Sequence, residues 1–100
     1  MAIARDPNRM GTPIHPGEIL AEDFLAPLRL SQAALARHLG ISQVRVNEIV
    51  RGKRGISAET AWLLAESFGT SPQFWLNLQA NYDLAVGRPA RHVRKIRRAS

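Results

Sequence analysis

Residues 31–51 decide the fold, and they read SQAALARHLGISQVRVNEIVR. Ser31 and Ser42 are good N-cap residues, and each stands directly before a run of apolar residues with helical spacing. The first run ends at Gly40, because glycine readily adopts the left-handed backbone conformation that terminates a helix. The stretch therefore predicts two short helices that are joined by the three-residue turn 40–42.

Helices joined by so short a turn cross at a steep angle, and this geometry restricts the residue types at the crossing. Ala36 is small where the second helix approaches, and Gly40 allows a positive φ in the turn. Ile41, Val46 and Ile49 have the spacing to fill the space between the helices. Together these features indicate a helix-turn-helix motif, whose second helix enters the major groove of DNA with its N-terminal residues at the base edges.

The second helix carries side chains that can read DNA. Because Val46, Ile49 and Val50 face inward, the helical period turns the opposite face toward solvent. On and beside that face, we expect base contacts from Gln43, Val44, Arg45, Asn47 and Glu48. Amides pair with adenine, arginine pairs with guanine, and an aliphatic side chain contacts the thymine methyl group. Glu48 is the discordant residue, and two roles stay open for it: acceptor from a cytosine amino group, or partner of a neighbouring arginine.

Another group of residues suits the DNA backbone, whose contacts set the register of a protein without reading sequence. Lys53 and Arg54 follow the second helix on its exposed side, and Ser31 stands at a helix start, where free backbone N–H groups bind anions. The predicted phosphate contacts are Ser31, Gln32, Ser42, Arg51, Lys53 and Arg54.

Charge is concentrated in two blocks. The chain has 14 Lys and Arg against 8 Asp and Glu, a net charge of +6. Segment 29–54 holds six basic residues against one acidic residue, and segment 88–100 holds six basic residues and no acidic one. This distribution indicates a polyanionic partner.

The composition excludes several kinds of site. The chain has no cysteine, which excludes a disulfide framework and a thiolate zinc site. Its histidines, His15, His38 and His92, are too scattered for a metal site or a catalytic pair, and no HExxH, P-loop or GxSxG motif is present. We therefore expect no enzyme activity, no metal and no cofactor. Because the N-terminus lacks the apolar segment of a secretory signal, we expect a cytoplasmic protein.

Start and stop residues divide the rest of the chain into further helices. A first helix opens at Pro16 and is closed by Pro27, a fourth occupies 57–69, and a fifth runs from Pro72 to about Val86. Almost nothing has the pattern of a strand. The sequence predicts an all-α domain of five helices over residues 15–87, after a flexible leader (1–14) and before a disordered basic tail (88–100).

The fifth predicted helix has more apolar surface than one core contact needs. Besides a broad stripe around Trp75, a second ridge points elsewhere and consists of Leu76, Ala80 and Leu84. We predict a two-fold dimer that packs this ridge against its mate; the alternative is that the leader covers it. Such a dimer would present two reading helices about 34 to 36 Å apart, one turn of DNA. We expect Trp62 and Trp75 in the core or an interface.

The basic tail leaves three interpretations open. It is a solvated charge run without a specific role, an arm that adds sequence-independent attraction to phosphates, or a segment that meets an acidic patch on a partner.

The chain resembles the HigA-type antitoxins of the Xre-like helix-turn-helix superfamily. The similar segments are His15-Pro16-Gly17-Glu18-Ile19-Leu20, Asn47-Glu48-Ile49-Val50, Gly52-Lys53-Arg54-Gly55-Ile56-Ser57, Phe74-Trp75-Leu76-Asn77-Leu78-Gln79 and Tyr82-Asp83-Leu84. They cover about seventy residues. The resemblance implies a lambda-repressor-like fold and a dimeric operator-binding repressor, which also holds a small mRNA-cleaving toxin inactive. Asn47 departs from the Ser or Thr that is commoner at its position, and the basic tail runs beyond the end of short members.

For the toxin contact we expect an acidic N-terminal group, since mRNA-cleaving toxins tend to be basic; its members are Glu18, Glu22 and Asp23. Two further functions stay open: a stand-alone Xre-like repressor without a toxin partner, and an interaction module without a DNA function. As a bacterial repressor, the protein would lie at the nucleoid when bound to its operator.

Overall fold

The computed structural model describes residues 12–97 of the 100-residue chain. In this part all regular elements are helical: α1 (Pro16–Ile19), η1 (Leu20–Leu25), α2 (Ala26–Leu28), α3 (Gln32–Leu39), α4 (Gln43–Val50), α5 (Ala58–Phe68) and α6 (Pro72–Val86). The first three elements follow one another without a break and form one helix, so the predicted all-α fold of five helices is confirmed over the described residues. The predicted leader residues 1–11 and tail residues 98–100 lie outside them.

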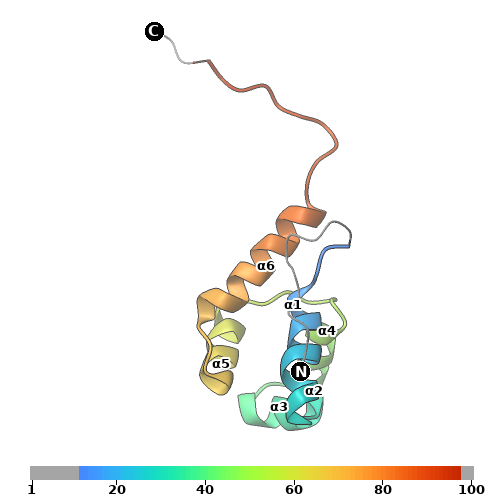
Figure 1. Cartoon of the computed structure of the whole chain (residues 1–100), viewed down its shortest axis with the longest axis vertical. Coiled ribbons are helices and arrows are strands. Elements are labelled where there is room, and N and C mark those ends of the chain that lie inside the picture. Colours follow the sequence, from blue (N-terminus) through green and yellow to red (C-terminus); the bar gives the residue numbers. More distant parts are fainter. Residues whose placement is uncertain (1–11, 98–100) are drawn as a thin grey trace.

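The helices form a small bundle from which the C-terminal part extends (Figure 1). Contacts join α3 to α4 and α5 to α6, and α1 touches both α4 and α6. Helix α6 points away from the bundle and continues into residues 88–97, which run on without regular structure (Figure 1). The helix-turn-helix pair therefore lies at the opposite end of the molecule from the tail.

The core is centred on Trp75, which is fully buried. Its ring lies 5.1 Å from the Phe24 ring, centroid to centroid, and its indole N–H donates to the Thr70 hydroxyl at 2.8 Å. The other fully buried apolar side chains come from every side of the bundle, among them Leu20, Leu35, Val46, Ile49, Ala61 and Leu64. The prediction that Trp75 lies in the core is confirmed. Trp62, by contrast, is 57% exposed and is not a core residue.

The prediction that Pro27 closes the first helix is wrong by one residue, because the helix continues to Leu28. The Ala26 N–H donates to the carbonyl of Ala21, five residues earlier, and this π-type pairing continues from η1. The wider turn relieves the clash between a proline ring and the carbonyl four residues before it, so the helix passes through Pro27 to Leu28.

Arg29 ends this helix in a conformation that usually belongs to glycine. Its φ is +52°, and it is the one non-glycine residue with positive φ in the described part of the chain. The N–H groups of Arg29 and Leu30 donate to the carbonyls of Ala26 and Leu25 at 3.1 and 2.9 Å. This is a Schellman motif, and it turns the chain sharply toward α3.

Gly17 allows the first helix to touch the fourth. A Cβ atom at this position would overlap the Ile49 carbonyl oxygen in the backbone of α4. The close approach fixes α4 on its inner side and leaves its outer side to solvent.

Candidate nucleic-acid interface

The helix-turn-helix pair has the predicted caps and turn. The Ser31 hydroxyl accepts from the Ala34 N–H at 3.0 Å, and the Ser42 hydroxyl accepts from the Arg45 N–H at 3.1 Å. Gly40 has a φ of +73°, and the Ile41 N–H donates back to the Ala36 carbonyl at 3.1 Å. The crossing of α3 and α4 is therefore set by interactions within residues 31–45.

The packing between the two helices also follows the predicted pattern. Val46 and Ile49 are each 1% exposed, and Ala36 is 3% exposed where the helices meet. Ile41 and Val50 are half-buried and pack against the same core. With this face buried, α4 turns its N-terminal end and its opposite face outward.

Gln43 and Val44 occupy the exposed N-terminal end of α4. Val44 is 68% exposed, which is high for an aliphatic side chain on an ordered helix. Both side chains are accessible from solvent, and the adenine and thymine contacts predicted for them stay predictions.

Arg45 has its guanidinium group against α5. Its Nη2 donates to the Thr60 hydroxyl at 2.7 Å and to a Glu59 carboxylate oxygen at 3.2 Å. The side chain is only 26% exposed, and its Nε atom is buried without a hydrogen-bond partner. In the free chain, the arginine predicted to read guanine is therefore held by α5.

Asn47 and Gln32 form an amide pair that joins α4 to α3. The Asn47 side-chain N–H donates to the Gln32 side-chain oxygen at 3.1 Å. The pair links a predicted base-reading residue to a predicted phosphate-binding residue, so the two side chains cannot orient independently.

Glu48 pairs with Arg54 after the end of the helix. One Glu48 carboxylate oxygen accepts from Arg54 Nε at 3.1 Å and lies 3.0 Å from Arg54 Nη2. Of the two roles left open for Glu48, partner of an arginine is the one this geometry displays.

The turn after α4 carries three exposed cations, Arg51, Lys53 and Arg54. Its backbone is ordered by the Glu48 carbonyl, which accepts from the Lys53 N–H at 2.8 Å and from the Arg54 N–H at 3.2 Å. The residues predicted to contact phosphates, at the two helix starts and in this turn, thus lie on either side of the exposed face of α4.

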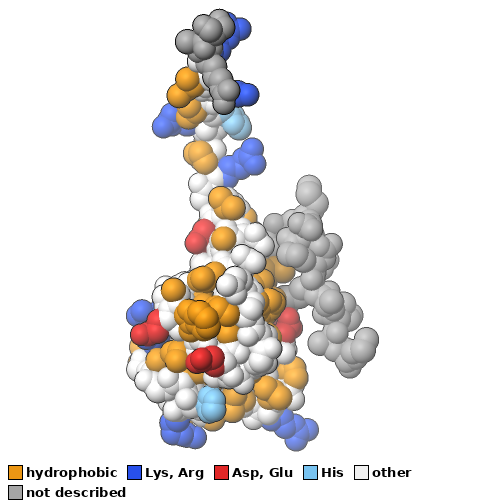
Figure 2. All heavy atoms as spheres, turned by 90° about the vertical axis from the view of Figure 1, so that its left-hand side faces the viewer, with side chains coloured by type: hydrophobic (Ala, Val, Ile, Leu, Met, Phe, Trp, Pro, Cys, Tyr) orange, Lys and Arg blue, Asp and Glu red, His pale blue; other side chains and the backbone are white. Residues whose placement is uncertain are grey.

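The ridge predicted to form a dimer is exposed. Leu76 is 37% and Leu84 74% exposed, and Ala80 between them is exposed as well. Among the described leader residues, Pro13 and Ile14 lie elsewhere: they line a groove of about 240 Å³ with Phe74, Leu78 and Tyr82. Figure 2 views the molecule from the side of α5 and shows hydrophobic side chains gathered there, with acidic side chains beside them.

The acidic group predicted for the toxin contact lies on the first helix, outside the helix-turn-helix pair. Glu18 and Glu22 are exposed and Asp23 is half-buried. Glu18 belongs to α1, whereas Glu22 and Asp23 belong to η1.

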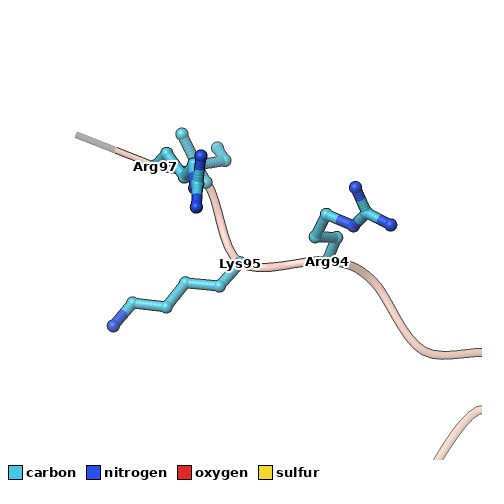
Figure 3. A pocket seen from close by; sticks show the side chains of 4 residues that line it. Arg94, Lys95 and Arg97 are labelled. Atoms are coloured by element: carbon cyan, nitrogen blue, oxygen red, sulfur yellow. The ribbon is translucent and has the colours of Figure 1, made fainter. Parts of the chain in front are cut away.

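The tail residues 88–97 are all exposed and have no regular structure. Arg94, Lys95 and Arg97 extend from an extended backbone in different directions, and Ile96 beside them is 89% exposed (Figure 3). The five basic residues of segment 88–97 therefore belong to a part of the chain that extends beyond the bundle.

His15 lies at the start of α1 as its N-cap residue. Its Nδ1 accepts from the Gly17 N–H at 2.9 Å, and its ring meets the Tyr82 ring edge-on with centroids 4.8 Å apart. Burial lowers the pKa of His15 below its usual value, and the Asp83 carboxylate partly offsets this shift.

Among residues 12–97, no three potential metal ligands come together. Nor is any helix of that part long and apolar enough to cross a bilayer.

Comparison with known proteins places this geometry in a family. The helix-turn-helix family matches residues 23–75. Virulence-associated protein I of Dichelobacter nodosus is 52% identical over 86 residues, which cover 86% of this chain and 79% of that protein.

Two solved structures share both sequence and fold. Pseudomonas aeruginosa antitoxin HigA, solved with the higBA promoter, is 56% identical with a TM-score of 0.74, over 75% of this chain and 82% of that one. An addiction module antidote protein of the HigA family from Coxiella burnetii is 51% identical with a TM-score of 0.73, over 77% and 84% of the two chains. The chain therefore belongs to the HigA family of helix-turn-helix antitoxins.

Proposed function

We propose that the protein binds the operator of its own promoter through α4, represses transcription there, and neutralises a partner mRNA-cleaving toxin. The observation that carries this proposal is the exposed N-terminal end of α4 with a turn of three cations behind it, in a chain 56% identical to an antitoxin solved with its promoter. Members of the family are DNA-binding antitoxins and not enzymes, in agreement with the absence of a catalytic motif in the sequence.

Of the proposed base-reading side chains, some are exposed at the start of α4 and others are hydrogen-bonded to α3 or α5. Gln43 and Val44 are available for adenine and thymine without rearrangement. Asn47 reaches the groove together with Gln32, since their amides are paired. Arg45 reads guanine after its guanidinium leaves Glu59 and Thr60. Glu48 orients Arg54 toward a phosphate.

Phosphate contacts set the register on either side of α4. The N-terminal ends of α3 and α4 offer backbone N–H groups at Ser31, Gln32 and Ser42. Arg51, Lys53 and Arg54 supply cations at the other end of the reading helix. These contacts are independent of sequence, and they make the affinity depend on salt.

The ridge of Leu76, Ala80 and Leu84 supports a homodimer through α6. A monomer would leave Leu84 74% exposed, and a two-fold pairing buries this side chain against its own copy. The pairing gives two reading helices for a near-palindromic operator.

The toxin contact is proposed at Glu18, Glu22 and Asp23, whose charge suits a basic enzyme and which lie on the first helix, outside the helix-turn-helix pair. The tail is proposed as an arm that is disordered in the free protein and adds attraction to DNA phosphates.

A stand-alone repressor without a toxin is the alternative to an antitoxin. An adjacent gene for a small basic protein would indicate an antitoxin and so distinguishes the two functions. Either function places the protein in the bacterial cytoplasm, at the nucleoid when it is bound to DNA.

The test is salt-dependent binding to a duplex of the protein's own promoter and to a scrambled duplex. We expect tight binding to the promoter alone, and we expect the double variant Arg45→Ala, Asn47→Ala to lose this preference while it still neutralises the toxin. Equal affinity for the two duplexes in the unaltered protein rejects operator recognition. Deleting residues 88–100 should lower the salt slope and keep the preferred sequence, because each neutralised phosphate contributes about 0.9 to the slope.

A further inference from the structure

The basic turn behind the reading helix is attached to α6 by one side chain. The Oε1 atom of Gln79 accepts from the Ile56 N–H at 2.7 Å, a contact between residues 23 positions apart. Ile56 itself is 5% exposed and belongs to the core. The backbone that follows Lys53 and Arg54 is therefore fixed to α6 at this bond.

The orientation of the Gln79 amide is determined at both ends. Its Nε2 donates to a carboxylate oxygen of Asp83 at 2.9 Å, one turn further along α6. Because an N–H donor must face the carboxylate and a carbonyl oxygen must face the Ile56 N–H, the two bonds exclude the flipped amide.

The turn also lies directly on this side chain. A Cβ atom on Gly55 would be only 3.1 Å from Gln79 Cδ and Oε1. Glycine at this position allows the backbone to approach the amide closely enough for the 2.7 Å bond at the next residue.

The other end of the turn lies close to the ring of His15. A Cβ atom on Gly52 would lie 3.6 Å from the His15 ring, and that ring packs edge-on against Tyr82 of α6. Segment 52–56 thus begins beside the His15 ring, which packs on Tyr82 of α6, and ends at the hydrogen bond to Gln79.

From this arrangement we propose that Gln79 is a positioning residue for operator binding. It holds the phosphate-contacting turn at a fixed place on α6, the helix that we propose pairs the two subunits. The inference rests on the proposed operator binding. We call the bonds of Gln79 to Ile56 and Asp83 the clamp. In a dimer, the clamp makes the distance between the two basic turns depend on how the two α6 helices pair. Its loss should remove phosphate contacts and leave base preference unchanged, because α4 has its own packing contacts with α1 and α3.

The experiment compares variants that break and restore the clamp. Gln79→Met removes both hydrogen bonds with a side chain of similar length. Gln79→Glu keeps an acceptor for Ile56 but places a second carboxylate beside Asp83. In the double variant Gln79→Glu, Asp83→Asn the amide of residue 83 can donate to the new carboxylate, so the bond between residues 79 and 83 returns with donor and acceptor exchanged, while the Ile56 N–H still donates to residue 79. Asp83→Asn alone controls for the change at residue 83 in the double variant, and Asn77→Ala is a control at an exposed position of α6.

The readouts are the salt slope of binding to the promoter duplex, the preference over a scrambled duplex, and helicity by circular dichroism. We expect Gln79→Met and Gln79→Glu to lower the slope by about 1 to 2, since each lost phosphate contact removes about 0.9. The sequence preference should stay, and the double variant should recover the slope. Asp83→Asn and Asn77→Ala should match the unaltered protein.

Three results overturn the role of Gln79: an unchanged slope in Gln79→Met, an equal fall in Asn77→Ala, or a double variant no better than Gln79→Glu alone. If Gln79→Met does not fold, the comparison of Gln79→Glu with the double variant decides the question in folded chains. Failure of the unaltered protein to prefer its promoter rejects the proposed function instead.

Discussion

The guanidinium group of Arg45 lies 2.7 Å from the hydroxyl of Thr60, although Val44, the preceding residue of α4, is 68% exposed. Thr60 is 1% exposed and also bonds to the Ser57 hydroxyl at 3.1 Å, so the acceptor cannot follow the arginine outward. Base reading by Arg45 therefore requires that bonds to α5 break before bonds to a guanine form, which lowers the net gain from that contact.

Glu59→Gln should release Arg45 in part. The Glu59 side chain is 70% exposed, and an ion pair this open contributes about 1 kcal/mol or less to stability. We expect unchanged folding and operator affinity raised up to about fivefold, the equivalent of 1 kcal/mol. Fluorescence anisotropy with the operator measures this change, and Glu66→Gln, one turn beyond Trp62 on α5, is the matched control. Weaker binding by Glu59→Gln would mean that Glu59 positions Arg45 for DNA.

Arg29→Gly should stabilise the protein. Positive φ costs a non-glycine residue about 1–2 kcal/mol, and glycine gives back part of this through its greater freedom when unfolded. We expect a gain of about 0.5–1 kcal/mol in the free energy of unfolding, measured with urea. Arg37→Gly removes the same side chain from an exposed position inside α3, where glycine costs about 1 kcal/mol. Changes of the same sign in both variants would contradict the argument.

Gly17→Ala should destabilise the bundle. The added methyl group meets the Ile49 carbonyl of α4, and a backbone atom cannot rotate out of the way. We expect a loss of about 3 kcal/mol in urea unfolding, the upper part of the range for overpacked cores. Glu18→Ala, at the next and exposed position, should cost under about 0.5 kcal/mol. A neutral Gly17→Ala would show that α1 and α4 can separate.

Leu84→Glu should produce a monomer. The substitution places like charges at the centre of the proposed ridge, where Leu84 is 74% exposed in the single chain. Sedimentation should give a dimer for the unaltered protein at micromolar concentration and a species of about 11.1 kDa for the variant. Val86→Glu, an exposed residue of α6 outside the ridge, should remain dimeric. A monomer in the unaltered protein would reject the α6 interface.

Stability should fall as the solution is acidified below pH 6.5, because of His15. Burial lowers its pKa in the folded state, so the unfolded chain binds the proton first as the pH falls. The contribution of His15 is therefore complete above its unfolded pKa and decreases from there down to the lowered pKa. Protonation also removes the Nδ1 acceptor that caps α1. Urea midpoints at pH 7.5 and pH 5 measure the effect. His15→Asn keeps a capping oxygen without a titratable ring and should lose less stability over the same interval.

Much of the fold follows from residues close together in the sequence. The caps of α3 and α4 and the left-handed Gly40 depend on contacts within a few positions, and all were predicted correctly. The first helix was not, because the effect of Pro27 depends on whether the preceding turn adopts the i to i−5 pairing. A proline in a helix clashes with the carbonyl four residues earlier, so the helix either ends there or widens in the preceding turn, and the sequence pattern did not tell which.

The candidate site was predictable in position but not in the state of its side chains. Periodicity placed Arg45 and Asn47 beside the reading face, yet it gave no sign of Glu59, Thr60 or Gln32 as their partners. These partners lie 14 or 15 positions away, and only the crossing of the helices brings them together. The role of Gln79 was not predicted for the same reason, since its bond to Ile56 joins residues 23 positions apart.

The extended segment 88–97 affects how the size of the protein must be measured. The described chain has a radius of gyration of 16.5 Å and a longest dimension of 58 Å. A compact chain of 100 residues has a radius of gyration of about 13 Å. An elongated particle diffuses slowly and elutes early from a gel-filtration column, so a monomer of this chain will imitate a heavier, rounder protein. Light scattering or sedimentation equilibrium, which report mass independently of shape, are the methods that can distinguish one copy from two.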